Sequence, residues 1–264
     1  MKVNSELHKT ALNLARQRLS LEPIFIDTKQ RPLDERRGYE LQEYVNRIIT
    51  GAGMGPVVGH KIGCTTPVMQ EFLGIRNPCA GAIFNQTVRY GGVDIPRSGF
   101  VKIGIECEMA VEIGKDINPE DGPFTDIDIY SSVSGVMAAI EMVDDRYANY
   151  KSLGVPALIA DNFFNSGCIL GDPITKWQKL DLVGIKGRTV INGIEVGFGN
   201  GRAVMGNPLR ALGWLVNSKR SLGQKIKKGD FVLLGSLVET KWLDKGDNAF
   251  IEIEGLGRLE VNVF

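Results

Sequence analysis

The fold of this chain is decided by the stretch Gly104-Ile105-Glu106-Cys107-Glu108-Met109-Ala110-Val111-Glu112. Throughout residues 101–113 every odd position is apolar, while the even positions include one lysine and three glutamates. This alternation predicts a half-buried β-strand, because successive side chains of a strand point to opposite faces. Glu106 and Glu108 would then lie about 7 Å apart on one face, where like charges destabilise the fold unless a positive charge lies between them.

Two interpretations of this acidic face are open. A row of glutamates along one strand face is most often a solvated surface. The alternative is a divalent cation such as Mg²⁺ or Mn²⁺, because hard ions prefer carboxylate oxygens.

A second stretch, Val136-Met137-Ala138-Ala139-Ile140-Glu141-Met142-Val143, favours the metal site. Glu141 is its single carboxylate, and burying an unpaired charge costs several kcal/mol or forces protonation. The nearest basic residue along the sequence is Arg146. A cation shared by Glu141 with Glu106 and Glu108 meets this need, and three carboxylates with open water positions are typical of Mg²⁺.

Composition places the chain among ordinary globular proteins. It has 264 residues, 43% of them hydrophobic and 23% charged, which is enough for one large domain or two small ones. Lys plus Arg equals Asp plus Glu, 31 each, and no basic run is interleaved with aromatics, so nucleic-acid binding is not expected.

The sequence also predicts a soluble, cytoplasmic protein with no membrane partner. No apolar run reaches about 18 residues, and the first residues lack the apolar core of a signal peptide. The four cysteines are scattered without a Cys-x-x-Cys pair, which speaks against a zinc ribbon and a disulfide scaffold. We expect free thiols at Cys64, Cys79, Cys107 and Cys168.

Periodicity divides the chain into a helical front and a β-rich remainder. Amphipathic helices are predicted at 5–19, capped by Asn4 or Ser5, and at 36–50, which gives an N-terminal helical segment over residues 1–56 packed on the core. Residues 57–264 are predicted to form a β-rich catalytic domain. Because its strands outnumber helices without strict βα alternation, an α+β fold with mixed or antiparallel strands is favoured.

Within this domain further segments are predicted from pattern and turn chemistry. Residues 74–100 are rich in Gly and Pro and are expected to form a loop, of the kind that often serves as a lid. Asn192-Gly193 predicts a type I′ hairpin turn, and Gly197–Gly201 predicts a β-turn. The other predicted elements are strands at 57–63, 231–238, 249–254 and 258–264 and helices at 67–73, 125–136 and 208–219.

Individual candidates for chemistry carry less weight. Lys61 lies between two glycines that would let a ligand approach the backbone, although a solvent-facing lysine is an equally good interpretation. Asp161-Asn162 is more simply a hydrogen-bonding pair at the end of a loop. The chain has two histidines and no Gly-x-Ser-x-Gly elbow, so serine-hydrolase chemistry is weakly supported.

Five motifs occur along the chain in a fixed order: Gly59-His60-Lys61-Ile62-Gly63-Cys64-Thr65, Glu106-Cys107-Glu108-Met109-Ala110, Glu141-Met142-Val143-Asp144-Asp145-Arg146, Ala160-Asp161-Asn162 and Gly235-Ser236-Leu237. Taken together, these ordered motifs resemble the fumarylacetoacetate hydrolase superfamily over nearly the whole chain. The closest branch looks like the 2-oxopent-4-enoate hydratases and 4-oxalocrotonate decarboxylases of aromatic meta-cleavage pathways.

The resemblance implies a mixed β core of the sandwich or roll type, like the C-terminal domain of that family. It implies a Mg²⁺ or Mn²⁺ ion, acting as a Lewis acid, and a 2-oxo acid that chelates the ion. The metal ligands would be Glu106, Glu108 and Glu141; Lys61 would offer positive charge or a proton near the oxo group. The catalytic candidates are Lys61, Cys79, Asp145 and Asp161, and the substrate-binding candidates are Asn162, Ser236 and Arg146; Asp161, Asn162 and Ser236 would line the pocket.

The reaction that the resemblance implies is hydration of a 2-hydroxy-2,4-dienoate to a 4-hydroxy-2-oxo acid. Decarboxylation of a 4-oxalocrotonate type, C–C hydrolysis of an acylpyruvate and a non-catalytic partner subunit are the alternatives. A homo-oligomer is expected, and association with a paralogous enzyme of the same pathway is open.

One departure from the family bears on the reaction. Hydratases of this group usually carry Pro-Asp-Phe-Gly or a similar lid motif, whereas this chain has Pro78-Cys79-Ala80-Gly81. A thiol with a pKa of about 8.5 substitutes poorly for a carboxylate. Asp145 also replaces the usual serine before Arg146. Either Asp144 or Asp145 takes over proton transfer, or the substrate differs from the standard dienoate.

Overall fold

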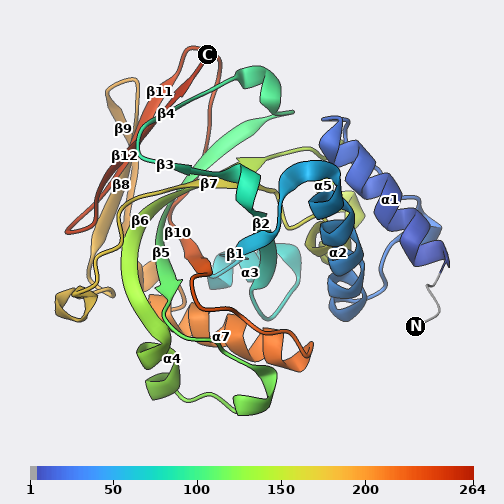
Figure 1. Cartoon of the computed structure of the whole chain (residues 1–264). Helices are drawn as coiled ribbons and strands as arrows, with labels where there is room; N and C mark the ends of the chain where they lie inside the picture. Colours follow the sequence, from blue (N-terminus) through green and yellow to red (C-terminus); the bar gives the residue numbers. More distant parts are fainter. Residues whose placement is uncertain (1–4) are drawn as a thin grey trace.

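The computed structural model describes residues 5–264, which form seven α-helices and two β-sheets (Figure 1). The helices are α1 (Ser5–Leu19), α2 (Glu35–Ile49), α3 (Pro67–Leu73), α4 (Asp126–Ser132), α5 (Tyr150–Leu153), α6 (Val155–Ala160) and α7 (Pro208–Ser221). The strands are β1 (Val57–Gly63), β2 (Cys79–Phe84), β3 (Val88–Tyr90), β4 (Val93–Ile95), β5 (Ile103–Ile113), β6 (Val133–Asp144), β7 (Asn165–Leu170), β8 (Lys186–Ile191), β9 (Ile194–Asn200), β10 (Phe231–Trp242), β11 (Asn248–Ile253) and β12 (Gly257–Val263).

The larger sheet has seven strands in the order β2-β1-β10-β5-β6-β7-β3, and the smaller one has five in the order β4-β12-β11-β8-β9. Both sheets mix parallel and antiparallel pairs, for example β1 parallel to β10 and β5 antiparallel to β6. Figure 1 shows the smaller sheet on one side of the molecule and helices α1 and α2 on the other, with the larger sheet between them. The predicted α+β architecture is confirmed.

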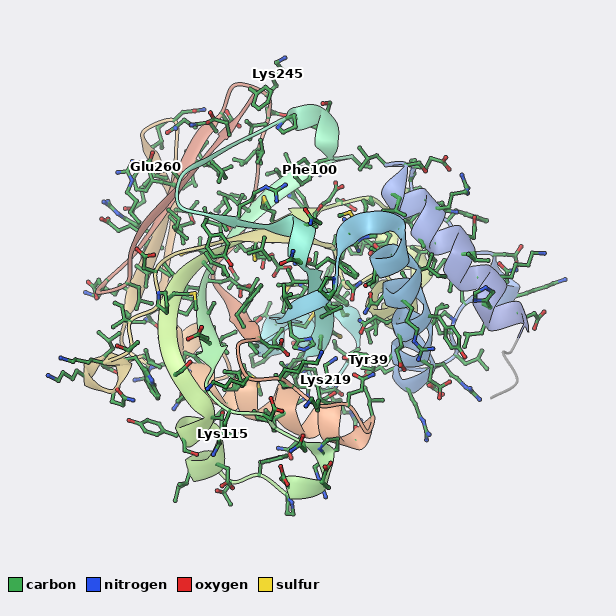
Figure 2. All side chains as sticks on the ribbon, viewed as in Figure 1. Tyr39, Phe100, Lys115, Lys219, Lys245 and Glu260 are labelled. Carbon is green, nitrogen blue, oxygen red and sulfur yellow. The ribbon has the colours of Figure 1, made fainter. Side chains whose placement is uncertain are left out.

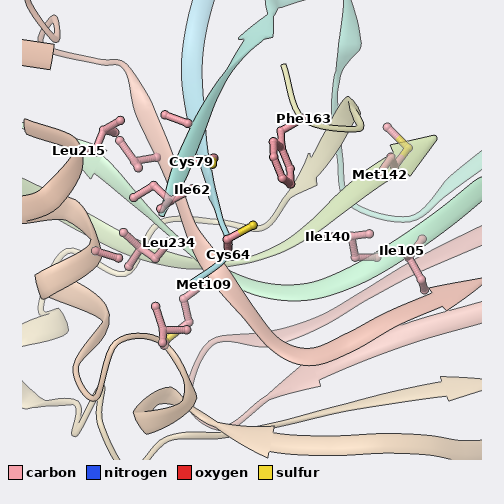
Figure 3. Packing of buried hydrophobic residues seen from close by; sticks show 14 of the residues in the cluster. Ile62, Cys64, Cys79, Ile105, Met109, Ile140, Met142, Phe163, Leu215 and Leu234 are labelled. Atoms are coloured by element: carbon pink, nitrogen blue, oxygen red, sulfur yellow. The ribbon is translucent and has the colours of Figure 1, made fainter. Parts of the chain in front are cut away.

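The core is one large apolar cluster with a second, smaller one on the larger sheet. Figure 3 shows the large cluster, in which Ile105 of β5 and Ile140 of β6 lie close together. Figure 2 shows the complementary pattern at the periphery, where Lys115 and Lys245 point outward. The strand predicted to be half-buried is in fact covered on both faces, because only Glu106 and Glu112 of β5 are partly exposed.

Local sequence explains most boundaries. Helix α2 begins after Asp34, whose side chain accepts from the N–H of Arg37, and α4 begins with a capping box formed by Thr125 and Asp128. The β8–β9 hairpin turns at Asn192 and Gly193 with φ of 51° and 80°, as the type I′ prediction requires. The predicted cap at Asn4 lies outside the described residues.

Three segments differ from the sequence predictions. The loop predicted over residues 74–100 is wrong, because it contains β2, β3 and β4, and all six residues of β2 are buried. The helix predicted over residues 125–136 ends at Ser132, since β6 begins at Val133 to pair with β5. The β-turn predicted at Gly197–Gly201 is mostly strand, because β9 continues to Asn200. In residues 5–264 we find no helix with the length and apolar character needed to cross a membrane.

Candidate active site

The pairing of β5 with β6 brings three carboxylates together. Glu106 lies directly opposite Glu141 in the antiparallel register, and Glu108 follows on the same face of β5. One carboxylate oxygen from each of the three residues lies within 4.8 Å of the other two. Glu108 and Glu141 are buried, and Glu106 is half-buried.

Protein groups of the described chain hold these carboxylates but leave two of their buried oxygens without a donor. Glu106 accepts from the Thr240 hydroxyl, and Glu108 Oε2 accepts from the Gly235 N–H at 2.9 Å. Glu141 Oε1 accepts from Asn165 Nδ2 at 3.0 Å. The buried Oε1 of Glu108 and Oε2 of Glu141 have no hydrogen-bond partner among the described residues. Buried oxygens without donors are costly, and this donor set fits a hard divalent cation.

Lys61 is the protein cation of this cluster, and the sequence argument missed its pairing with Glu141. Its Nζ lies 3.1 Å from Glu141 Oε1, and both side chains are almost fully buried. Lys61 is distant from Glu141 in the sequence, and β1 reaches the carboxylates through its parallel pairing with β10, which pairs with β5. One ammonium against three carboxylates leaves an excess of negative charge at the site.

The pKa shifts follow from burial and from that excess of negative charge. Burial first, and then the charge of Glu141, raise the pKa of Glu106 above its ordinary value. Burial, Glu141 and Glu106 raise the pKa of Glu108 well above that of an ordinary carboxyl. Burial alone would lower the pKa of Lys61, but the three carboxylates outweigh it and raise the pKa. A bound dication would relieve the repulsion that raises the carboxyl pKa values.

A cavity of about 370 Å³ lies beside the cluster. Its polar wall includes Lys61, Glu106, Asp145, Ser236 and Thr240, and much of its apolar wall comes from Leu73, Tyr150, Leu158, Phe163, Phe164 and Trp242. An apolar pocket with a few convergent polar groups is the arrangement expected of a small-molecule site. Of the predicted site residues, the cavity is lined by Lys61, Glu106, Asp145 and Ser236.

Asp145 and its neighbour Asp144 have different environments. The Asp144 carboxylate accepts from the N–H groups of Val101 and Lys102, at 3.2 and 2.6 Å, and is fully buried. Asp145 lines the cavity, and its buried Oδ1 has no partner among the described residues. Asp145 is therefore the member of this pair that can exchange a proton with a ligand.

Asp161 and Arg146 do not line the cavity. Asp161 Oδ2 accepts from Arg146 Nη2 and from the Tyr147 hydroxyl, each at 2.8 Å, and Oδ1 accepts from Arg18 at 3.2 Å. Burial alone would raise the pKa of Asp161, but Arg146 and Arg18 hold it below its ordinary value. Asp161 and Arg146 form ion pairs with protein groups, and neither side chain lies where it could contact a ligand in the cavity.

Asn162 is likewise occupied by protein contacts. Its Oδ1 accepts from the Ala82 N–H at 2.8 Å, and its Nδ2 donates to Asn46 Oδ1 at 2.7 Å. Asn162, Phe163 and Phe164 all have positive φ, between 50° and 67°, a conformation that costs energy in non-glycine residues. The anchored Asn162 thus holds a strained turn whose next two residues line the cavity.

Cys79 is part of a strand and not of a lid. It is the first residue of β2, fully buried, and it does not line the cavity. A hydrogen bond with Cys64, followed by burial, raises the pKa of the Cys79 thiol. A buried, protonated thiol outside the cavity does not replace the lid carboxylate.

Sequence reasoning missed several residues that shape the site: Asn165, Thr240, Phe163, Phe164 and Trp242. The run Asp161-Asn162-Phe163-Phe164-Asn165 has neither helical nor strand periodicity, and such a break between predicted elements was the available signal for a shaped turn.

Comparison with known proteins gives the family and the fold of the chain. A family model described as fumarylacetoacetate (FAA) hydrolase C-terminal matches residues 77–264. A 2-keto-4-pentenoate hydratase of Paraburkholderia phymatum is 30% identical over 229 residues, which cover 87% of this chain and 86% of that protein. A 2-oxo-hept-4-ene-1,7-dioate hydratase of Escherichia coli is 29% identical over 250 residues, covering 92% and 91%.

Among solved structures, 4-oxalocrotonate decarboxylase from Pseudomonas putida G7, complexed with magnesium and adipate, superposes with a TM-score of 0.92 at 24% identity. The superposition covers 100% of this chain and 99% of that one, and it supports the fold. With a family match over most of its length, the chain belongs to the fumarylacetoacetate hydrolase family.

Proposed function

We propose that this protein is a metal-dependent hydratase of aromatic-compound degradation. It would add water to a 2-hydroxy-2,4-dienoate of the 2-oxopent-4-enoate type and release a 4-hydroxy-2-oxo acid. The observation that supports this most directly is the trio of Glu106, Glu108 and Glu141, with two unpartnered buried oxygens beside a largely apolar cavity. The names of the relatives from P. phymatum and E. coli favour hydration.

Glu106, Glu108 and Glu141 would hold Mg²⁺ or Mn²⁺. Bound there, such an ion supplies Lewis-acid polarisation of the oxygens of a 2-oxo acid. The protein's own part in binding falls to Lys61, whose ammonium lies next to Glu141. Lys61 would balance negative charge that develops on the substrate as its double bonds shift, or donate a proton to the oxo oxygen.

Asp145 is our candidate for proton transfer. Ketonisation of the dienoate needs a proton delivered to carbon, and the water that adds at C4 must lose one. Asp145 lines the cavity, and no group of residues 5–264 donates a hydrogen bond to its Oδ1. Ser236 also lines the cavity and would contact the substrate; its hydroxyl donates to the Val238 carbonyl, so its lone pairs remain available as acceptors.

The alternatives are less well supported. C–C hydrolysis of an acylpyruvate needs a water-activating base, and His60, the one buried histidine of the described chain, does not line the cavity. Decarboxylation shares the metal-bound 2-oxo acid and fits the P. putida fold neighbour. The non-catalytic alternative rests on Cys79 in place of a lid carboxylate, and the carboxylate of Asp145 in the cavity is the group that argues against it.

Some predictions of the sequence remain proposals. These are the division into a helical segment at 1–56 and a catalytic domain at 57–264, a cytoplasmic location, a homo-oligomeric state and association with a paralogous enzyme. The division has support in the two N-terminal helices at one side of the fold (Figure 1).

The decisive experiment incubates the full chain and Mg²⁺ or Mn²⁺ with three substrates: 2-hydroxypenta-2,4-dienoate, 4-oxalocrotonate and an acylpyruvate. Mass spectrometry distinguishes a gain of water, a loss of CO₂ and a split into two acids. We expect water to be gained with the dienoate, and only when the metal is present. Turnover of another substrate in its place, or of none by the metal-loaded protein, would overturn the proposal.

A further inference from the structure

The cavity has one wall at the carboxylates and another away from them. Leu73, Tyr150 and Leu158 line the cavity and also border a second hollow of about 170 Å³. None of the three clustered glutamates borders that second hollow. Leu73, Tyr150 and Leu158, which are apolar apart from the Tyr150 hydroxyl and are called the apolar trio below, therefore form the far wall, where the tail of a ligand held at the carboxylates would lie.

Positive charge is confined to the near wall. Among the cavity-lining residues of the described chain, Lys61 is the one cation, and it is already paired with Glu141. The other charged lining residues besides Glu106 are Asp145 and Glu239, and Lys241 neutralises Glu239 at 2.6 Å. At the far wall a second substrate carboxylate would meet mostly apolar side chains and no cation of the cavity lining, and the cost of burying an unpaired charge excludes such a ligand efficiently.

Two exposed lysines near the cavity are poorly suited to bind a second substrate carboxylate. Lys102 Nζ lies 4.4 Å from the ring centre of Trp242, and Lys151 Nζ lies 5.0 Å from that of Phe72. Both lysines are solvent-exposed. Neither lines the cavity, although Lys151 borders the second hollow behind the far wall. Exposed ammonium groups are hydrated and screened by salt, so they give little selectivity.

The volume of the cavity indicates that the substrate carries a substituent at its far end. A cavity of about 370 Å³ is within the range of about 300–1,000 Å³ that takes drug-sized ligands. An unsubstituted five-carbon acid has far fewer atoms than such a ligand. Space beyond it is bounded by the apolar trio and by Phe164 and Trp242.

We propose that this site takes 2-oxo acids and 2-hydroxydienoates that carry one carboxylate and an alkyl or aryl group at the far end, and discriminates against a carboxylate there. The inference rests on the proposed function, since it assumes that the 2-oxo carboxylate end lies at the metal cluster. Sequence identity does not make this choice, because the relatives named for a pentenoate and for a 1,7-dioate are 30% and 29% identical.

The test uses two non-reacting ligands that differ only at the far end, 2-oxohexanoate and 2-oxohexanedioate. Calorimetry with the Mg²⁺-loaded full chain should show that the monoacid binds at least 10-fold more tightly. 2-Oxooctanoate should bind as tightly as 2-oxohexanoate or more so. Equal or tighter binding of the dioate, or no binding of either acid to metal-loaded protein, would overturn the inference.

A pair of variants at Leu73 tests whether the apolar far wall causes the preference for the monoacid. Leu73 is partly buried at the end of α3, so Leu73→Arg should place a cation at the far wall and reduce the preference for the monoacid at least several-fold. Leu73→Met keeps the apolar character and should retain the preference. An unchanged preference in Leu73→Arg would contradict the assigned location of the tail.

Turnover separates this inference from the proposed function. The full chain with Mg²⁺ is assayed on 2-hydroxypenta-2,4-dienoate, its alkyl-extended homologue and 2-hydroxyhepta-2,4-diene-1,7-dioate. We expect kcat/KM for the dioate to be at least 10-fold below that for the alkyl dienoate. Efficient hydration of the dioate would refute the inference and leave the hydratase function standing. Absence of hydration, with the monoacid preference retained in calorimetry, would refute the function alone.

Discussion

Arg18 reaches from helix α1 to Asp161 and donates through Nη1 to both its main-chain carbonyl, at 2.9 Å, and its carboxylate, at 3.2 Å. Arg18 Nη2 also donates to the main-chain carbonyl of Asn165 at 2.7 Å. Asn165 in turn holds Glu141 through its side-chain amide. A residue outside the segment matched by the family model is thereby connected to a candidate metal ligand through a single intermediate residue.

We therefore expect Arg18→Ala to reduce metal affinity as well as stability. Loss of the guanidinium leaves the buried carbonyl groups of Asp161 and Asn165 with fewer donors, at a cost of about 2 kcal/mol in the free energy of unfolding. Calorimetric titration with Mn²⁺ and urea unfolding are the measurements. Arg16→Ala is the matched control, because Arg16 is on the same helix and its side-chain contacts in the described part of the chain, with Glu22 and Asn13, are solvent-exposed. Equal behaviour of the two variants would show that the connection has no effect on the site.

The Asp161 network predicts a particular response to acid. The pKa of Asp161 is lowered in the folded protein, below the value of about 3.9 for an unperturbed aspartate. A lowered folded-state pKa contributes stability that is complete above the unfolded-state pKa and is lost as pH falls through the folded-state pKa. The free energy of unfolding should therefore decrease below about pH 4. Asp161→Asn should be less stable at neutral pH and show a smaller decrease over the acidic window; parallel curves would contradict this assignment.

The three-glutamate site predicts that metal binding and turnover are lost together when one of its carboxylates is removed. Glu141→Gln removes one negative charge and one strong ligand, so we expect Mn²⁺ binding and turnover to fall by about 1,000-fold, or about 4 kcal/mol. Glu112→Gln is the control on the neighbouring strand, since Glu112 is half-buried and bonds Ser134 outside the cluster. Electron paramagnetic resonance of Mn²⁺ and steady-state rates report the two losses. Normal metal binding in Glu141→Gln would show that this carboxylate is not a ligand.

The three glutamates of the site could be predicted from sequence because charged side chains are unusual in segments whose pattern predicts burial. Glu106 and Glu108 are on one face of an alternating strand, and Glu141 is the lone charge in an apolar run. The pairing of Lys61 with Glu141 could not be predicted in this way, because it depends on which strands become neighbours in the sheet.

Local sequence patterns gave wrong secondary structure where tertiary contacts decide the backbone conformation. Residues 74–100 have the Gly and Pro content of a loop, yet β2 is buried because β1 pairs with its full length. Asp161 and Asn162 make the hydrogen bonds that the sequence suggested for them, but they follow helix α6 and not a loop. Spacing did not indicate that Phe163 and Phe164 would adopt left-handed conformations and line the cavity.

The adjacent residues Asp144 and Asp145 provide the last prediction, because the sequence left open which of them transfers protons. Asp144 satisfies two main-chain N–H groups, so Asp144→Asn should lower the free energy of unfolding by about 1–3 kcal/mol. Asp145 has a free oxygen at the cavity, so Asp145→Asn should leave unfolding nearly unchanged and lower kcat by about 100-fold or more. Thermal unfolding and steady-state kinetics on 2-hydroxypenta-2,4-dienoate measure the two effects. The opposite result would be full kcat in Asp145→Asn and a loss of kcat, with little change in stability, in Asp144→Asn. That result would reverse the two roles, because proton transfer would then depend on Asp144, whose carboxylate already accepts two main-chain hydrogen bonds.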